Sequence, residues 1–184
     1  MLPEHVDQVL PALLPAAKSF NQQIYLWLGA RNQNHLVQVE IARKIKKARS
    51  PRVFLMIKNQ PWEDERHWLG IYQHILGTGL NQKQIIGCHR GFAPSGKRNP
   101  QQFRNLPHFD LAMKIKTQTN LPMLLDPSHI GGSVTNVITV LKKAQKFNFD
   151  GYLIEAHPRP SQALSDSTQQ LNATGLKSAL KIIS

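Results

Sequence analysis

Short, continuously apolar runs recur along the chain, and each of them ends in polar residues. Five such runs can be read in the sequence: IYLWLGARN (24–32), VFLMIKN (53–59), QIIGCHRG (84–91), LPMLLDPSH (121–129) and GYLIEAHP (151–158). Each is short enough for one strand, and the lack of polar alternation is typical of a parallel strand that is covered on both faces. The pattern therefore predicts five buried parallel strands.

The segments between these runs carry apolar residues at helical spacing. Helices are predicted over residues 34–48, 63–76 and 133–146, each with an apolar stripe along one side. Lysines gather near the C-terminal ends of the first and third helices, where cations interact favourably with the helix dipole. The alternation of strands and helices predicts an α/β fold with a parallel sheet. Residues 1–184 are read as a single domain, since no linker stands out.

Polar side chains stand where each predicted strand ends. Arg31, Lys58, Arg90, His129 and Glu155 close the five apolar runs in chain order. The carboxyl ends of parallel strands meet at one edge of an open sheet or at one mouth of a (β/α)8 barrel, and ligands bind there in both architectures. We therefore expect these five side chains to converge on one site.

Three of the polar residues suit a metal ion. The two-residue period of a strand turns Glu155 toward the same space as its neighbours' ends, His129 closes the preceding strand, and Asp166 lies in the loop beyond. One imidazole and two carboxylates suit a divalent ion such as Mn, Fe, Co or Zn. The alternative is that Glu155 is a buried carboxylate paired with a basic residue and that His129 is a loop residue.

The basic residues at the strand ends suit an anion. Arg31, Lys58 and Arg90 would form a compact pocket for a phosphate or carboxylate, unless they are solvated surface cations. The nearby stretch GFAPSGKR (91–98) begins like a nucleotide-binding P-loop. However, Arg98 stands where Ser or Thr must bind magnesium, so a P-loop is excluded.

Composition narrows the class of partner. The formal charge is +12 and the pI is near 10.1, which favours an anionic partner such as nucleic acid, a membrane surface or phosphorylated metabolites. The basic stretch 42–52 lacks interleaved aromatic residues and is interpreted as a solvated helix end, which disfavours nucleic acid. No run is long enough to cross a bilayer, and the apolar N-terminus lacks the basic start of a signal peptide. The single cysteine, Cys88, favours a cytoplasmic location.

The strand-end segments also resemble a known family. In order, LWLGARN, FLMIKN, GCHRGF, LLDPSHIGG, GYLIEAHPRPSQALSD and QQL resemble the second half of 3-deoxy-D-arabino-heptulosonate 7-phosphate (DAHP) synthases. The similarity runs from about residue 3 to residue 171. It is to the branch related to 3-deoxy-octulosonate 8-phosphate synthases, and HRGF resembles the version that is often fused to chorismate mutase.

This resemblance implies a (β/α)8 barrel enzyme of the shikimate pathway. Such a transferase condenses phosphoenolpyruvate with erythrose 4-phosphate, using a divalent metal. It implies that His129, Glu155 and Asp166 are metal ligands and that Arg31, Lys58 and Arg90 bind phosphoenolpyruvate. The resemblance further implies catalytic roles for Lys58 and His129.

The resemblance also implies that part of the barrel has no counterpart in this chain. A (β/α)8 barrel needs about 250 residues, and MLPEHVDQVL resembles the third helix, so we expect an incomplete barrel of about five strands. The metal-binding cysteine of strand one and the KPR segment of strand two would be absent, which weakens metal binding and activity. A non-catalytic protein with an anion or metal pocket is the alternative, and a nucleic-acid binder is a third reading.

The expected partners follow from the incomplete barrel. Small phosphorylated substrates would bind at the strand ends. Unpaired strand edges at 24–29 and 151–155 would favour a homo-oligomer or association with a missing N-terminal half.

Overall fold

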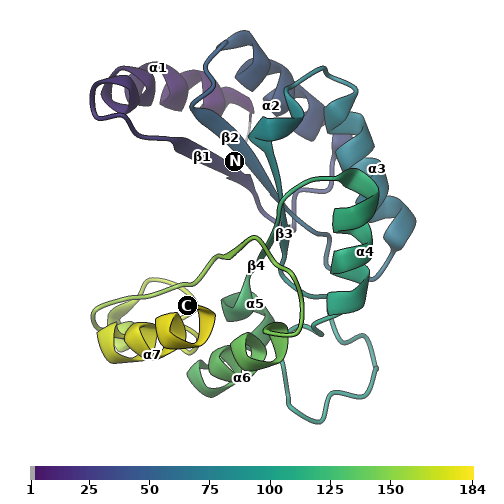
Figure 1. Ribbon diagram of the computed structural model, residues 1–184, viewed down its shortest axis with the longest axis vertical. Helices are drawn as coiled ribbons and strands as arrows, with labels where there is room; N and C mark the ends of the chain where they lie inside the picture. The colour runs from purple at the N-terminus through teal and green to yellow at the C-terminus, as the bar shows by residue number, and fades with distance from the viewer. Residues whose placement is uncertain (1–2) are drawn as a thin grey trace. The chain divides into compact units, whose positions relative to one another are not determined.

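The computed structural model describes residues 3–184 and contains a sheet of five strands flanked by helices (Figure 1). The strands are β1 (Ile24–Leu28), β2 (Val53–Lys58), β3 (Ile85–His89), β4 (Met123–Leu125) and β5 (Gly151–Tyr152). They follow one another in the sheet in chain order, and β1 with β2 and β4 with β5 pair in parallel. The prediction of an α/β fold with five parallel strands is therefore confirmed.

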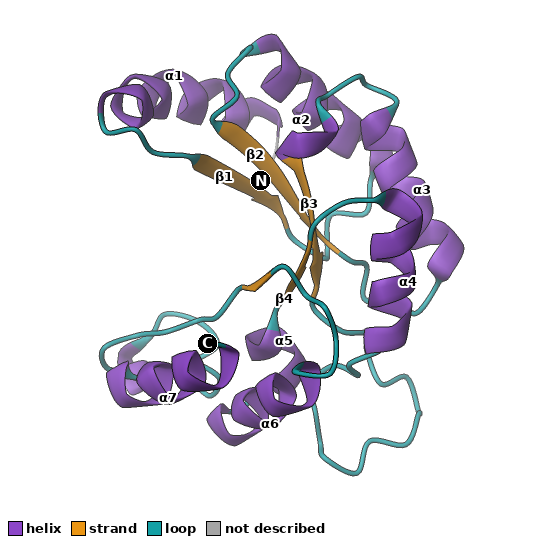
Figure 2. Ribbon diagram, viewed as in Figure 1, coloured by secondary structure: helices purple, strands orange, loops and turns teal. Residues whose placement is uncertain are grey.

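Helices follow the strands along the chain (Figure 2). They are α1 (Pro3–Ser19), α2 (His35–Lys47), α3 (Glu65–Leu76), α4 (Phe109–Thr119), α5 (Pro127–Gly131), α6 (Val134–Ala144) and α7 (Ala173–Ile183), with 3-10 turns η1 (Gln82–Gln84) and η2 (Pro160–Gln162). The three predicted helices correspond to α2, α3 and α6 within two residues at each end. Sequence periodicity missed α4 and α7. No helix in residues 3–184 combines the length and the apolar character needed to cross a bilayer.

Polar caps fix where several helices begin. Asn34, Asp64, Ser133 and Asn172 precede α2, α3, α6 and α7, and each side chain accepts a hydrogen bond from a backbone N–H two or three residues later. These caps satisfy N–H groups that have no partner inside the helix. The helix starts, and hence the lengths of the strand–helix connections, are therefore set by local chemistry.

Two compact groups of residues can be distinguished, and the first contains β1 and β2. It comprises the residues up to Gln60 together with Asp64–Gly87 and Ile115–Pro122. Helices α1 and α2 lie on the same face of β1 and β2 (Figures 1 and 2). The core of this unit is formed by buried side chains, among them Leu26, Ile41, Ile45, Leu55 and Trp68.

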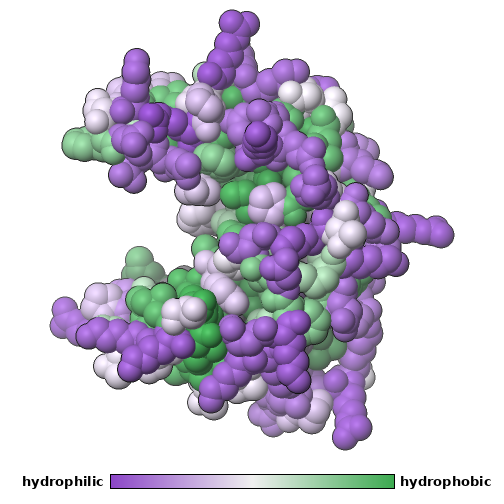
Figure 3. Space-filling model, in the orientation of Figure 1, coloured by the Kyte–Doolittle hydropathy of each residue, from purple (hydrophilic) through white to green (hydrophobic). Residues whose placement is uncertain are grey.

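The second unit contains β4, β5 and the last three helices. It comprises Pro61–Glu63, Cys88–Lys114 and Met123–Ser184. One cluster of buried side chains is formed by Phe103, Phe109, Leu125, Ile130, Val140 and Ala144, and a second joins α6 to α7 through Val137, Leu141, Leu171 and Ala179. Figure 3 shows hydrophobic side chains at the surface near α7, where Leu180 is half exposed. The reading of residues 1–184 as a single domain stays a prediction.

Strand β1 is covered on one face only. Ile24, Leu26 and Leu28 are buried, whereas Tyr25 is 48% and Trp27 is 55% exposed. The prediction that every strand is buried on both faces is wrong for β1, because α1 and α2 cover the face opposite to the two aromatic side chains. The Tyr25 ring stacks on Phe54 of β2, with the centroids 5.2 Å apart. An aromatic surface is therefore exposed beside an end strand of the sheet.

The fifth apolar run forms a much shorter strand than predicted. Only Gly151–Tyr152 are strand residues, and all of 151–155 is half-buried. Beyond them, the Leu171 N–H donates to the Glu155 carbonyl (3.0 Å) and the His157 N–H donates to the Leu171 carbonyl (2.9 Å). The predicted unpaired edge over 151–155 is thus wrong at its C-terminal end, because the segment that precedes α7 occupies it.

We expect the exposed face of β1 to drive self-association. Trp27→Lys places a charge on an end strand, where it opposes pairing with another chain, and should lower the sedimentation coefficient at high protein concentration. The matched control is Leu164→Lys, which replaces another exposed apolar side chain by the same charge in a loop. Concentration-independent monomer sedimentation of the unsubstituted chain would contradict the prediction.

Candidate metal centre

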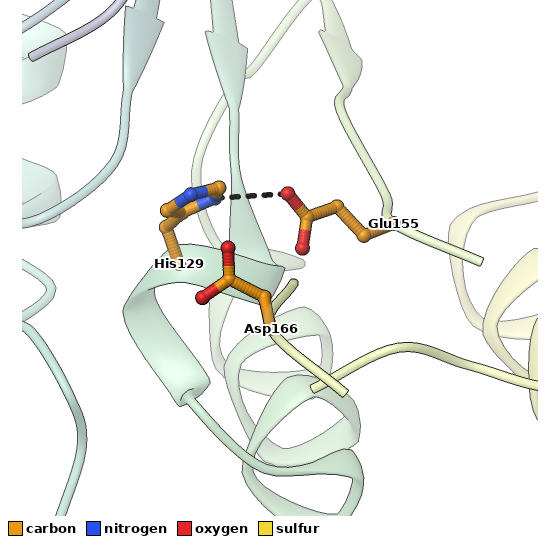
Figure 4. Close-up of side chains that lie close together, drawn as sticks. All are labelled: His129, Glu155 and Asp166. Atoms are coloured by element: carbon orange, nitrogen blue, oxygen red, sulfur yellow. Dashed lines mark ion pairs between the residues drawn. The ribbon is translucent and has the colours of Figure 1, made fainter. Parts of the chain in front are cut away.

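Three predicted side chains come together at the end of β4 and β5. His129 lies in α5, Glu155 lies just beyond β5, and Asp166 lies in the loop between η2 and α7. One ligand atom from each lies within 4.8 Å of the others. Figure 4 shows the three side chains pointing toward one another. A strand end, a one-turn helix and a loop therefore build one cluster of nitrogen and oxygen donors.

His129 is positioned by the motif that contains it. The Asp126 carboxylate caps α5 by accepting a hydrogen bond from the His129 backbone N–H (3.0 Å), and Pro127 occupies the first turn, where its missing N–H costs nothing. The Asp126 N–H in turn donates to the His89 carbonyl (2.9 Å). The tight turn D-P-S-H thus projects the imidazole from the end of β4.

Glu155 is held through both its backbone and its side chain. Its backbone N–H donates to the hydroxyl of Ser128 (2.9 Å), so the same D-P-S-H turn supports this residue as well. Gln169, which is fully buried, donates from Nε2 to Glu155 Oε2 (2.8 Å). One carboxylate oxygen is thereby fixed, and Oε1 faces His129.

Asp166 is held by an arginine that the sequence did not reveal. Its backbone is left-handed (φ 52°), a conformation that non-glycine residues adopt at a cost. Its Oδ1 pairs with Arg104 Nη1 at 2.5 Å. The same Nη1 donates to Gln169 Oε1 (2.8 Å). The loop residue is therefore tied to the buried side chain that also holds Glu155.

The donor set fits a divalent cation. His129 Nδ1 lies 2.9 Å from Asp126 Oδ2 and 3.6 Å from Glu155 Oε1, yet it is buried without a hydrogen bond. Three carboxylates, those of Asp126, Glu155 and Asp166, lie in and around the cluster with the guanidinium of Arg104, so the formal charge of these four side chains is negative and favours a cation. Two ligand atoms bonded to one metal at about 2.0–2.2 Å lie at most ~4.4 Å apart, so the three ligand atoms, which lie within 4.8 Å of one another, must approach somewhat to share an ion. Nitrogen and carboxylate donors suit Mn, Fe, Co or Zn.

The three basic residues lie at strand ends. Arg31 is exposed three residues beyond β1, and Lys58, the last residue of β2, is 8% exposed. The register Leu28↔Ile57 places these two strand ends side by side. Arg90 directly follows β3 and donates from Nη1 to Asn105 Oδ1 (2.9 Å). A common anion pocket for the three residues stays a prediction.

The segment 102–106 supplies partners that the sequence analysis missed. Asn105 accepts from Arg90 and donates from Nδ2 to the His129 carbonyl (2.6 Å), which links the predicted anion-binding arginine to the metal centre. Arg104 holds Asp166 from the neighbouring position. These residues follow no strand and belong to no apolar pattern, so strand-end reasoning could not find them.

Two glycines let this segment approach. Gly91 (φ +78°) would place a Cβ 2.8 Å from Asn105 Cβ, and Gly132 (φ +72°) would place one 2.6 Å from Arg104 Cβ. Both the positive φ and the lack of space require glycine there. The glycines of HRGF and HIGG were thus the available signal that another backbone segment passes close to the strand ends.

A polar cavity of about 600 Å³ opens beside the cluster. Its lining includes Arg104, Gly132, Ser133, Asp166 and Thr168. Asp166 and Arg104 therefore reach solvent, whereas Asp126 and Gln169 are fully buried. Small ions can enter the centre from this side.

A buried histidine lies next to Arg90. Burial, and to a smaller extent the neighbouring His108 and Arg90, lower the pKa of His89 to about 3, against the opposing effect of Asp126. The ring packs near Phe92 and Phe109, with centroid distances of 5.6 and 6.2 Å. His89 is therefore neutral in the folded protein at physiological pH.

Comparison with known proteins shows similarity to one family. The model of the DAHP synthetase I family matches residues 25–184. Phospho-2-dehydro-3-deoxyheptonate aldolase of Thermotoga maritima is 30% identical over 145 residues, which are 79% of this chain and 39% of that protein. 2-Dehydro-3-deoxyphosphooctonate aldolase of Francisella philomiragia is 25% identical over 124 residues, which are 60% of this chain and 42% of that protein. The chain thus spans about two fifths of the length of these relatives.

Solved structures show the same similarity. The crystal structure of the T. maritima phospho-2-dehydro-3-deoxyheptonate aldolase (DAHP synthase) superposes with a TM-score of 0.75 and 26% identity, covering 94% of this chain and 46% of that one. A truncated form of 3-deoxy-D-arabino-heptulosonate 7-phosphate synthase from T. maritima gives a TM-score of 0.71 and 27% identity, covering 86% and 56%. The family expected from the strand-end motifs is the family that the comparisons show.

The neutral state of His89 predicts a pH-dependent stability. Because the folded-state pKa lies near 3 and the ordinary value is 6.5, the unfolded chain binds a proton between these values that the folded chain does not. This residue should therefore lower the free energy of unfolding by about 1 kcal/mol for each pH unit below 6.5. In denaturant titrations from pH 7 to pH 4, His89→Phe should flatten that slope. The control His74→Phe removes an exposed histidine and should keep it; equal slopes for all three proteins would refute the prediction.

Proposed function

We propose that this chain, which belongs to the DAHP synthetase I family, provides the metal centre of a 3-deoxy-7-phosphoheptulonate synthase. In this reaction phosphoenolpyruvate, erythrose 4-phosphate and water give the seven-carbon phosphate and inorganic phosphate. The observation that supports the proposal best is the cluster of His129, Glu155 and Asp166 at the ends of parallel strands, the edge where ligands bind in such folds.

The proposed roles follow from the charges of the side chains. His129, Glu155 and Asp166 would hold a divalent ion, for which Mn, Co, Fe and Zn all suit the donor set. When bound, this ion would polarise the sugar aldehyde for attack by the methylene carbon of phosphoenolpyruvate. Arg90 would bind the anionic groups of phosphoenolpyruvate, and we extend that role to Arg31 and the catalytic role to Lys58 and His129 from the resemblance.

Asn105 explains why Arg90 is suited to this role. An arginine used for a planar anion must present its guanidinium in a fixed orientation. Asn105 is buried, accepts from Arg90 Nη1 and donates to the His129 carbonyl. The side-chain amide of Asn105 would therefore fix the position of Arg90 relative to His129. Such preorganisation favours reaction between a bound anion and a metal-bound partner.

A binding protein without turnover is the second candidate. The sequence has no KPR segment, and Cys88, its one cysteine, is fully buried in β3. The groups that the resemblance assigns to the fourth metal ligand and to the second substrate therefore have no match among these 184 residues. Under either candidate the partners are small phosphorylated compounds, and we place the protein in the cytoplasm.

Removal of Arg90 should abolish phosphoenolpyruvate binding. We expect Arg90→Ala to weaken the affinity at least tenfold, because charge-assisted hydrogen bonds to the anion are lost. Isothermal titration calorimetry with phosphoenolpyruvate measures this directly. The control Arg98→Ala removes an exposed arginine of the following loop and should bind like the unsubstituted chain. Equal affinities for both variants would disprove the assignment of Arg90.

Turnover by the 184-residue chain should be slow and should depend on His129. With both substrates and Mn²⁺, we expect phosphate release at least about a hundredfold slower than by the T. maritima relative, since misplacement of reacting groups by about 1 Å has an effect of that size. The residual rate should vanish in His129→Ala. Fast release would exclude an impaired centre, and phosphate release that survives His129→Ala would exclude the proposed centre.

A further inference from the structure

One chain of contacts joins the two carboxylates of the candidate centre. Arg104 Nη1 donates to Asp166 Oδ1 and to Gln169 Oε1, and Gln169 Nε2 donates to Glu155 Oε2. Each carboxylate thus has one oxygen engaged by the bridge. Glu155 Oε1 remains directed toward His129, and Figure 4 shows one Asp166 oxygen turned the same way.

We propose that Arg104 and Gln169 are positioning residues that set the affinity and geometry of this centre for a divalent cation. The inference rests on the proposed function, because it takes His129, Glu155 and Asp166 as the ligands. Neither Arg104 nor Gln169 contacts the ion. They act by fixing which oxygen each carboxylate presents, a role that partners of metal ligands commonly perform.

The bridge is itself anchored in the fold. Gln169 is fully buried, and its neighbour Thr168 donates to the Gly132 carbonyl (3.0 Å) and accepts from the Val134 N–H (3.1 Å). Gly132 also leaves the space that the Arg104 side chain occupies. The amide of Gln169 is therefore a rigid reference point, and Arg104 transmits its position to Asp166, which lies in a loop without regular structure.

Charge supports the same assignment. Carboxylates that face one another repel, and without a cation they would turn apart. Arg104 offsets part of this repulsion by pairing with Asp166, so that this carboxylate can keep its orientation before an ion arrives. If Arg104 instead competed with the ion for Asp166, its removal would strengthen metal binding, so the two roles predict effects of opposite sign.

The test uses Mn²⁺ alone as the probe and the full 184-residue chain. Arg104→Lys keeps the charge but loses the fork that reaches two acceptors, and Gln169→Met keeps the size but loses both hydrogen bonds. Matched controls are Arg98→Lys and Gln162→Met, which alter exposed residues outside the bridge. Mn²⁺ affinity is measured by titration calorimetry, and the thermal midpoint without metal reports whether each variant folds as the parent does.

We expect the Mn²⁺ affinity to fall about tenfold to a hundredfold in each bridge variant and to remain unchanged in the controls. The double variant should lose less than the product of the two single losses, because both residues act in one chain. With Co²⁺ as a second probe, the visible absorption spectrum should change in the bridge variants, which a general loss of stability would not cause.

Several outcomes overturn the inference. Unchanged or tighter Mn²⁺ binding in Arg104→Lys and Gln169→Met, while the unsubstituted chain binds Mn²⁺ in a His129-dependent way, refutes the positioning role and leaves the proposed centre intact. Fully additive losses refute the shared bridge. Absence of Mn²⁺ binding by the unsubstituted chain overturns both this inference and the proposed metal centre.

Discussion

The repulsion between Glu155 and Asp166, beside the buried Asp126 carboxylate that contacts His129, is the constraint on which this end of the molecule depends. Ligand atoms of Glu155 and Asp166 lie within 4.8 Å of each other, and two unit charges at that distance at the surface of a protein repel by roughly 3–4 kcal/mol, so these carboxylates need compensation. Asp126 obtains it from the backbone N–H of α5, and Glu155 and Asp166 obtain it from the Gln169–Arg104 bridge. The protein thus offsets part of the repulsion between the candidate ligands through its own hydrogen bonds and one ion pair.

Much of the architecture could be predicted because it is written in local patterns. Continuous apolar runs predicted the five strands, and segments with apolar residues at helical spacing predicted three helices. Helix α4 escaped because its buried side is Phe109, Ala112 and Ile115, and an alanine gives little hydrophobic contrast in a stretch that alternates apolar residues with lysine. Helix α7 buries only Ala179 fully. Weak burial leaves a weak signal in the sequence.

The candidate ligands could be predicted from their positions at strand ends, whereas their hydrogen-bonding partners could not. His129 and Glu155 stand at strand ends, and parallel strands bring such positions together whatever the loops do. Arg104 is separated from Asp166 by 62 residues and from Gln169 by 65. Its approach depends on the path of a loop past two glycines, and no periodicity encodes that path. The same limit applies to β1, whose apolar run did not reveal that one of its faces lacks a cover.

An antiparallel bridge between Phe92 and Leu106 closes the loop that ends with Arg104 and Asn105. The positions of these two residues therefore depend little on how long that loop is. Leu106 N–H donates to the Phe92 carbonyl (2.7 Å) and Phe92 N–H donates back (3.1 Å), while residues 95–98 in the intervening loop are exposed. The closure entropy of a loop grows only slowly with its length. Insertions or deletions near 95–98 should therefore change the positions of Arg104 and Asn105 little. This stretch is therefore the place where the chain can diverge in sequence and size, or accept a foreign peptide, while its ends stay pinned beside the strand ends.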